Sequence, residues 1–139
     1  MSSRLMDYFN KQPRIGILST ANREGKVNAA LFGSPQMVDE KTVVMGLGKN
    51  RTLDYLQQNP HAVYTILEPG ETLMDWKGLR VYLKLKDCAT SGKKLEDYKR
   101  EVAAALGEDA AKMMHATLTF EVTEVRPIVD MGQGWEKSV

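Results

Sequence analysis

The residues best suited to chemistry lie in one short segment, Gly46-Leu47-Gly48-Lys49-Asn50-Arg51-Thr52-Leu53, where a strand pattern ends and a helix pattern begins. The free N–H groups at the start of a helix carry partial positive charge. Lys49, Arg51 and the Thr52 hydroxyl add hydrogen-bond donors, and an arginine can bind a phosphate through two of its donors. Glycines at this point let the backbone approach a ligand closely. The segment therefore predicts a site for a single phosphate dianion.

Two well-known phosphate-binding motifs do not match this segment. A Walker A loop requires a glycine five residues before the Gly48-Lys49 pair and a Ser or Thr after it, but Val43 and Asn50 stand there. The dinucleotide-binding fingerprint requires a third glycine where Arg51 stands, within a strand–helix–strand unit. A capped surface helix with two solvated cations explains the same residues, and this alternative stays open.

Three consecutive strand patterns precede the segment and position it. Runs from Ile15 to Ser19 and from Lys26 to Ser34 flank a turn and predict a β-hairpin. A turn over residues 39–41 leads to a third strand, Thr42 to Leu47. Asn50 is a good N-cap for a helix that runs to Gln58 and ends at Asn59-Pro60. Ser2 or Ser3 is expected to cap a short helix at the start of the chain.

The second half adds strands at Ala62 to Leu67, at Leu79 to Leu85 and from Ala116 onward. The last two alternate, and their inward-facing residues are Leu79, Val81, Leu83 and Leu85 in one and Ala116, Leu118, Phe120 and Val122 in the other. Ser91 is expected to cap a longer helix that Gly107 ends. The tail from Met131 to Val139 is expected to be loosely held. Six or so strands with closely spaced turns predict a mainly β fold, an antiparallel sheet or barrel.

Composition narrows the class of protein. The 139 residues fit one domain spanning 1–139, and a formal net charge of +1 gives no reason to expect nucleic-acid or membrane binding. Cys88 is the only cysteine, which excludes an intramolecular disulfide and favours the cytoplasm, and the N-terminus does not read as a signal peptide. His61 and His115 have no partners at metal-ligand spacing, so we expect no metal. We also expect structural roles for both histidines and an unreactive Cys88.

Three ordered segments resemble the FMN-binding split barrels related to pyridoxamine 5′-phosphate oxidase. They are the hairpin from Gly16 to Ser34, the stretch Val43 to Leu53, and Leu56-Gln57-Gln58-Asn59-Pro60-His61-Ala62. Their order is the family's: three strands, the phosphate-binding helix, Asn-Pro, and a further strand. The resemblance covers about the first half of the chain and implies an antiparallel, homodimeric split β-barrel that binds FMN. The residues that bind the substrate phosphate in pyridoxamine phosphate oxidases are not found, so that reaction is not expected.

The resemblance also implies which residues hold the cofactor. The FMN phosphate would contact Lys49, Asn50, Arg51 and Thr52. The isoalloxazine ring would lie along two strands, contacting Asn28, Ala29, Ala30 and Leu31 on one and Met45, Gly46 and Leu47 on the other. A partner subunit would complete the site, and Trp76 and Trp135 are the candidates to cover the ring, although ordinary packing explains each tryptophan as well.

Two functions remain open on these grounds. The first is an FMN-dependent oxidoreductase or flavin reductase with a small-molecule redox partner, a nicotinamide or a deazaflavin. The flavin carries that chemistry, so no catalytic acid or base of the protein is required and none is identified. The second is a non-catalytic electron carrier or FMN storage protein. A flavin-free barrel that acts as a binding module is a more distant third. We also expect a dimer because Leu79, Val81 and Leu83 would need a partner to cover them.

Overall fold

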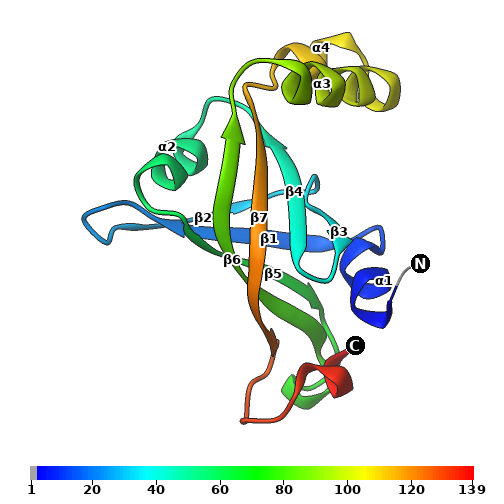
Figure 1. Ribbon diagram of the computed structural model, residues 1–139. Helices are drawn as coiled ribbons and strands as arrows, with labels where there is room; N and C mark the ends of the chain where they lie inside the picture. The colour runs from blue at the N-terminus through cyan, green and yellow to red at the C-terminus, as the bar shows by residue number, and fades with distance from the viewer. Residues whose placement is uncertain (1–2) are drawn as a thin grey trace.

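The computed structural model describes residues 3–139 and contains a seven-stranded sheet with several helices (Figure 1). The strands are β1 (Ile15–Ala21), β2 (Val27–Leu31), β3 (Gln36–Asp39), β4 (Thr42–Leu47), β5 (His61–Glu68), β6 (Lys77–Ala89) and β7 (Ala116–Pro127). The α-helices are α1 (Arg4–Asn10), α2 (Arg51–Gln58), α3 (Lys93–Leu106) and α4 (Glu108–Lys112), and short 3₁₀ turns are η1 (Leu73–Asp75) and η2 (Trp135–Ser138).

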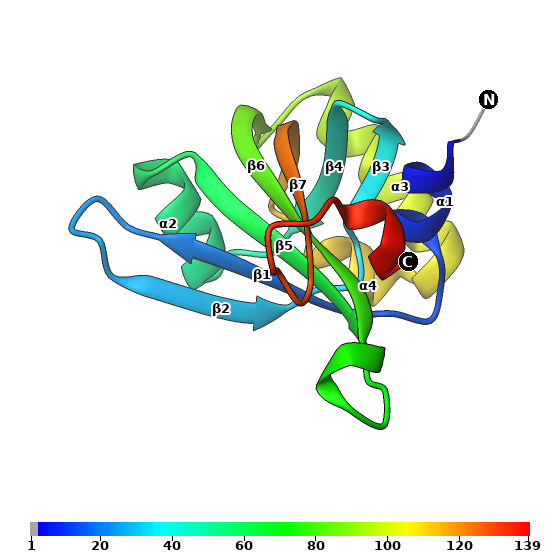
Figure 2. The ribbon, with the colours of Figure 1, turned by 90° about the horizontal axis from the view of Figure 1, so that it is seen from below.

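All neighbouring strands pair antiparallel, in the order β2-β1-β5-β6-β7-β4-β3. The sheet is strongly curved, so that β1 and β2 cross behind β6, β7 and β4 (Figures 1 and 2). The mainly β, antiparallel fold predicted from the sequence is confirmed. Strand β3 was missed because only Met37 of its four residues is buried, which leaves no alternating pattern to detect.

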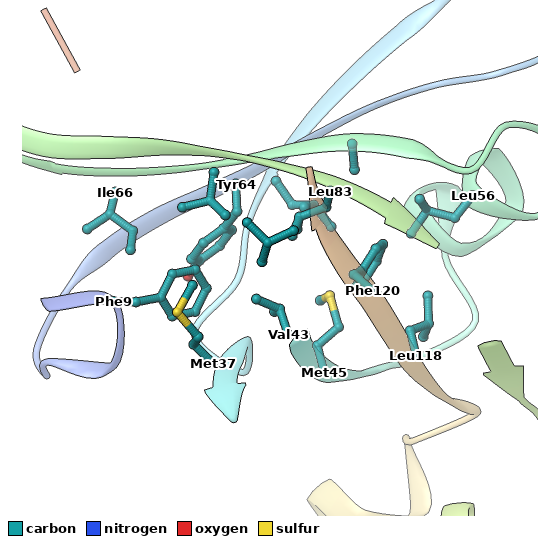
Figure 3. Close-up of a cluster of buried hydrophobic side chains, with 14 of the residues drawn as sticks. Phe9, Met37, Val43, Met45, Leu56, Tyr64, Ile66, Leu83, Leu118 and Phe120 are labelled. Atoms are coloured by element: carbon teal, nitrogen blue, oxygen red, sulfur yellow. The ribbon is translucent and has the colours of Figure 1, made fainter. Parts of the chain in front are cut away.

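The concave side of the sheet holds the hydrophobic core (Figure 3). The inward positions of β7 were predicted correctly, and so were Leu79, Val81 and Leu83 of β6, which are at most 2% exposed. This burial corrects one argument for a dimer, because the chain's own core covers these three leucine and valine side chains. α1 contributes Phe9 to the same core, beside the ring of Tyr64.

The predicted N-cap residues are confirmed for two helices and wrong for a third. Ser3 and Asn50 cap α1 and α2 with their side chains, whereas Ser2 lies outside the described residues. Ser91 does not cap α3. That helix begins at Lys93 after Gly92, whose φ of 90° is the left-handed conformation that glycine tolerates best, and no side chain caps it.

The C-terminal tail is held in place rather than loose. Arg4 of α1 donates to the Glu136 carbonyl oxygen at 2.6 Å, and Ser138 is buried. At the turn before the tail, Asp130 accepts hydrogen bonds from Arg126 and from Arg80. Together these contacts explain why a stretch rich in glycine and charge takes a defined path. Among residues 3–139, no helix is both long and apolar enough to cross a bilayer.

The hydrogen bonds from Arg80 and Arg126 to Asp130 imply that acid weakens the attachment of the tail. The bond from Arg126, more than any other contact, lowers the pKa of Asp130 from 3.8 to about 2. A carboxyl group with a lowered pKa in the folded state stabilises the protein above its ordinary pKa, and this contribution is lost as the pH falls toward the lowered value. We therefore expect the melting temperature of Asp130→Asn to fall less steeply than that of the wild type between about pH 4 and pH 2. Parallel melting-temperature curves for the two proteins would contradict this assignment.

Candidate functional site

The start of α2 presents two cations to solvent. The Asn50 side chain accepts a hydrogen bond from the Leu53 N–H at 2.9 Å, so it is already used as the helix cap. Lys49 and Arg51 flank it and are exposed. The ion pairs found within residues 3–139 involve neither of them. Their charges and the free N–H groups of the first helical turn are thus available to one anion.

Behind this helix start lies a small group of polar side chains. Thr52 is 2% exposed, and its hydroxyl accepts a hydrogen bond from the Asn28 amide of β2 at 3.3 Å. Thr20 of β1 pairs directly with Asn28, so both side chains lie on the same face of the sheet. Thr20 is 4% exposed, and its hydroxyl has no hydrogen-bond partner among the residues that the structure describes.

A polar ligand group beside this hydroxyl would give it a hydrogen-bond partner. Leaving a buried polar group without a partner costs about 1–3 kcal/mol. A ligand that carries hydroxyl and phosphate oxygens fits the arrangement, because polar groups line the inner side and cations line the rim. The ribityl phosphate arm of a flavin has this chemistry, so the residues present fit such a cofactor.

The site lies where the two ends of the sheet approach each other without pairing. β2 is one edge of the sheet, and β4 is next to the other edge. The loop after β2 is tied to β4 by the Ser34 hydroxyl, which donates to the Gly46 carbonyl oxygen at 3.2 Å. We call the region bounded by β2, β4 and the start of α2 the strand opening.

The predicted ring-contacting residues divide between two faces of β2. Asn28 and Ala30 are half-buried on the side of the strand that faces α2, whereas Ala29 and Leu31 are exposed on the other side. Side chains alternate along a strand. A flat ring that lies against one face can therefore contact the side chains of one pair only, and the pair on the face with Asn28 adjoins the helix start.

The β4 residues also contribute differently than expected. Met45 and Leu47 are at most 1% exposed, and their side chains belong to the core, so only their backbone can face the opening. A Cβ at Gly46 would overlap the ring of Tyr98 from α3. The glycine was expected to let a ligand approach, but within the chain it makes room for Tyr98.

Both tryptophans lie far from the helix start of their own chain. Trp76 is half-buried in a recess with Met74 and Met131. Trp135 packs against the core. Figure 1 shows the β5–β6 connection and the C-terminal turn at the lower end of the molecule, away from α2. Either tryptophan would therefore have to contact a cofactor from a second copy of the chain.

The remaining chemically versatile residues do not gather at the opening. His61 and His115 are exposed at the starts of β5 and β7. Burial is the main cause that raises the pKa of the Cys88 thiol, which disfavours the reactive thiolate. Within residues 3–139, no three His, Cys, Asp or Glu side chains are placed to hold a metal ion together.

Three residues at the site were missed in the sequence. Thr20 occupies an inward position of an alternating strand, and a polar residue at such a position is a signal that was available. Ser34 and Tyr98 had no comparable signal, because their contacts with Gly46 join segments that are distant in sequence.

No protein-family model matches the chain, and no curated protein matches it either. Solved structures do resemble it. An FMN-binding protein from Syntrophomonas wolfei subsp. wolfei is 20% identical with a TM-score of 0.72, over 91% of this chain and 83% of the other. A FAD-binding protein from Mesorhizobium loti is 13% identical with a TM-score of 0.63, over 90% of this chain and 92% of the other.

A third structure that resembles the chain is HutZ, the haem storage protein from Vibrio cholerae. It is 14% identical with a TM-score of 0.65, over 96% of this chain and 100% of the other. At these identities the likeness concerns the fold. The chain thus has the split-barrel fold of the flavoproteins that resemble pyridoxamine 5′-phosphate oxidase, as the sequence predicted.

Proposed function

We propose that this protein binds FMN in the strand opening and acts as an FMN-dependent oxidoreductase. The observation that carries the proposal is the arrangement at α2. Among residues 3–139, Lys49 and Arg51 form no ion pair and flank a capped helix start, and the Thr20 hydroxyl behind it has no hydrogen-bond partner. A phosphate at the rim and a polar arm reaching inward match both features. The shared fold with an FMN-binding protein supports the same assignment.

Each side chain has a distinct role in this proposal. Arg51 and Lys49 neutralise the phosphate dianion, while the N–H groups of the first turn donate to it. Asn50 holds the helix start in place through its cap. Asn28 and Thr20 offer hydrogen bonds to the polar arm, and the backbone of Met45 to Leu47 borders the ring. When bound, the flavin supplies the electron-transfer chemistry.

A second copy of the chain is proposed to complete the site. The outer face of β1 and β2 carries apolar side chains in solvent: Val27 is 83% exposed, Leu31 is 71% exposed, and Ile17 lies directly opposite Leu31. β2 is also an unpaired sheet edge, which proteins usually protect. Beside Val27, a trough of about 250 Å³ runs across β5 and β6, below the roughly 300–1,000 Å³ of ordinary ligand pockets. This face is opposite to the one that carries Asn28, so the partner is proposed to cover it and to reach around the edge strand β2 to supply the missing wall, with Trp76 and Trp135 as its candidate contributions.

An electron carrier or FMN storage protein is the alternative. It shares the cofactor site but needs no room for a second reactant. The FMN-loaded protein should therefore be mixed with NADH, NADPH or a reduced deazaflavin, and flavin reduction followed by absorbance. Reduction much faster than that of free FMN supports an oxidoreductase. Reduction no faster than that of free FMN with all three donors would favour the carrier.

A further inference from the structure

The connection between β6 and β7 folds back over the end of β4. This connection contains α3 and α4, and we call residues 90–115 the helical excursion. Figure 1 shows α3 and α4 at the upper end of the sheet, beside the end of β4. The excursion therefore lies next to the segment that leads into the cation-bearing start of α2.

Three contacts fix the excursion to Gly46–Gly48. The ring of Tyr98 occupies the space where Gly46 lacks a side chain, and a Cβ at Gly48 would come within 3.1 Å of the Met113 carbonyl oxygen. The His115 N–H donates to the Leu47 carbonyl oxygen at 2.8 Å. Neither glycine has a positive φ, so space rather than backbone conformation favours glycine at both positions.

Tyr98 also reaches the other side of the strand opening. Its hydroxyl lies near the Ser34 hydroxyl and the Gly46 carbonyl oxygen, and Ser34 itself donates to Gly46. Burial outweighs both polar neighbours and raises the pKa of Tyr98, so the phenol stays protonated and can donate a hydrogen bond. One side chain of the excursion thus joins the loop after β2 to β4.

We propose that Tyr98 is a positioning residue that sets the distance between β2 and β4 and thereby shapes the part of the opening that receives the flavin ring. This inference rests on the proposed flavin site. It assigns the helical excursion a role in cofactor binding without direct contact with the phosphate. The affinity for the ring is then expected to depend on Tyr98, whereas the preference for a phosphorylated flavin depends on Arg51.

The test measures dissociation constants for FMN and riboflavin with Tyr98→Phe and Tyr98→Ala. Loss of the hydroxyl should weaken both ligands about two- to tenfold, and loss of the whole ring about tenfold or more. The ratio of the two constants should stay at the wild-type value, and the circular dichroism of the bound flavin should change. Tyr8→Phe and Tyr8→Ala are matched controls, because Tyr8 is also half-buried and its hydroxyl donates to Glu68 at 2.7 Å, at α1. Both controls should retain wild-type flavin binding.

A second pair of variants keeps the test decisive if Tyr98→Ala does not fold. Gly46→Ala should weaken both flavins because the added methyl group displaces Tyr98, and in the double variant with Tyr98→Ala that additional loss should disappear. Wild-type affinity for both flavins in Tyr98→Phe and Gly46→Ala would overturn the inference and leave the flavin site intact. A wild-type protein that binds neither flavin would overturn the proposed function, and the inference with it.

Discussion

Replacing Arg51 by alanine is expected to weaken FMN about ten- to hundredfold while leaving riboflavin nearly unchanged. Arg51 is exposed at the start of α2 and forms none of the ion pairs found within residues 3–139. Its removal therefore breaks no internal salt bridge and takes away only a donor to the phosphate. A charge-assisted hydrogen bond contributes on the order of 1.5–3 kcal/mol, which gives the stated factor. Flavin fluorescence titrations of the wild type and the variant measure the dissociation constants for FMN and riboflavin.

Arg100→Ala is the matched control, because Arg100 is an exposed arginine on α3 whose ion pair is with Asp97 of the same helix. Its affinities for FMN and riboflavin should equal those of the wild type. Equal losses of FMN and riboflavin in Arg51→Ala would place Arg51 away from the phosphate. An unchanged affinity for FMN would remove the phosphate site from this helix start.

Introducing a charge on the outer face of β2 should have the second large effect. Leu31→Glu is expected to convert a dimer into a monomer that no longer retains FMN, because the proposed partner covers Leu31 and Ile17. Burying one unpaired carboxylate in an interface costs on the order of 2–5 kcal/mol, or about 25-fold or more in the dissociation constant of the dimer. Light scattering across a dilution series, recorded together with flavin fluorescence, follows both properties.

Leu106→Glu provides the control for this experiment. Leu106 lies at the end of α3 and is 75% exposed, close to the 71% of Leu31, but it lies outside the proposed interface. The variant should remain dimeric and keep its flavin. If the wild-type protein is a monomer with full FMN occupancy, the second copy is not part of the site, and the whole cofactor pocket lies within one chain.

Local sequence signals predicted the parts of the fold that depend on neighbouring residues. The alternation in β6 and β7, the Asn50 cap and the hairpin of β1 and β2 each follow from residues a few positions apart. The Ser91 cap was wrong, because Gly92 takes the N-cap position with a φ of 90° and moves the helix start one residue further on. The loosely held tail was also wrong, since its anchor, Arg4, lies at the other end of the chain.

In the candidate site, too, the features formed by neighbouring residues were predicted and the contacts between distant segments were not. The cations at α2 were found from spacing alone, because strand end, glycines and helix cap are contiguous. The contacts of Ser34 and Tyr98 with Gly46 depend on how the sheet curves and where the helical excursion returns. No sequence period encodes such contacts. For that reason Gly46 was interpreted as space for a ligand, although the chain fills that space itself.

The visible absorbance spectrum of the purified protein tests most directly whether it binds FMN. We expect a yellow protein with the two-band flavin spectrum, and denaturation should release a noncovalent flavin identified as FMN. Protein purified without flavin should regain the same spectrum when FMN is added. A colourless protein that takes up no FMN, or one whose spectrum is that of bound haem, would contradict the proposed function.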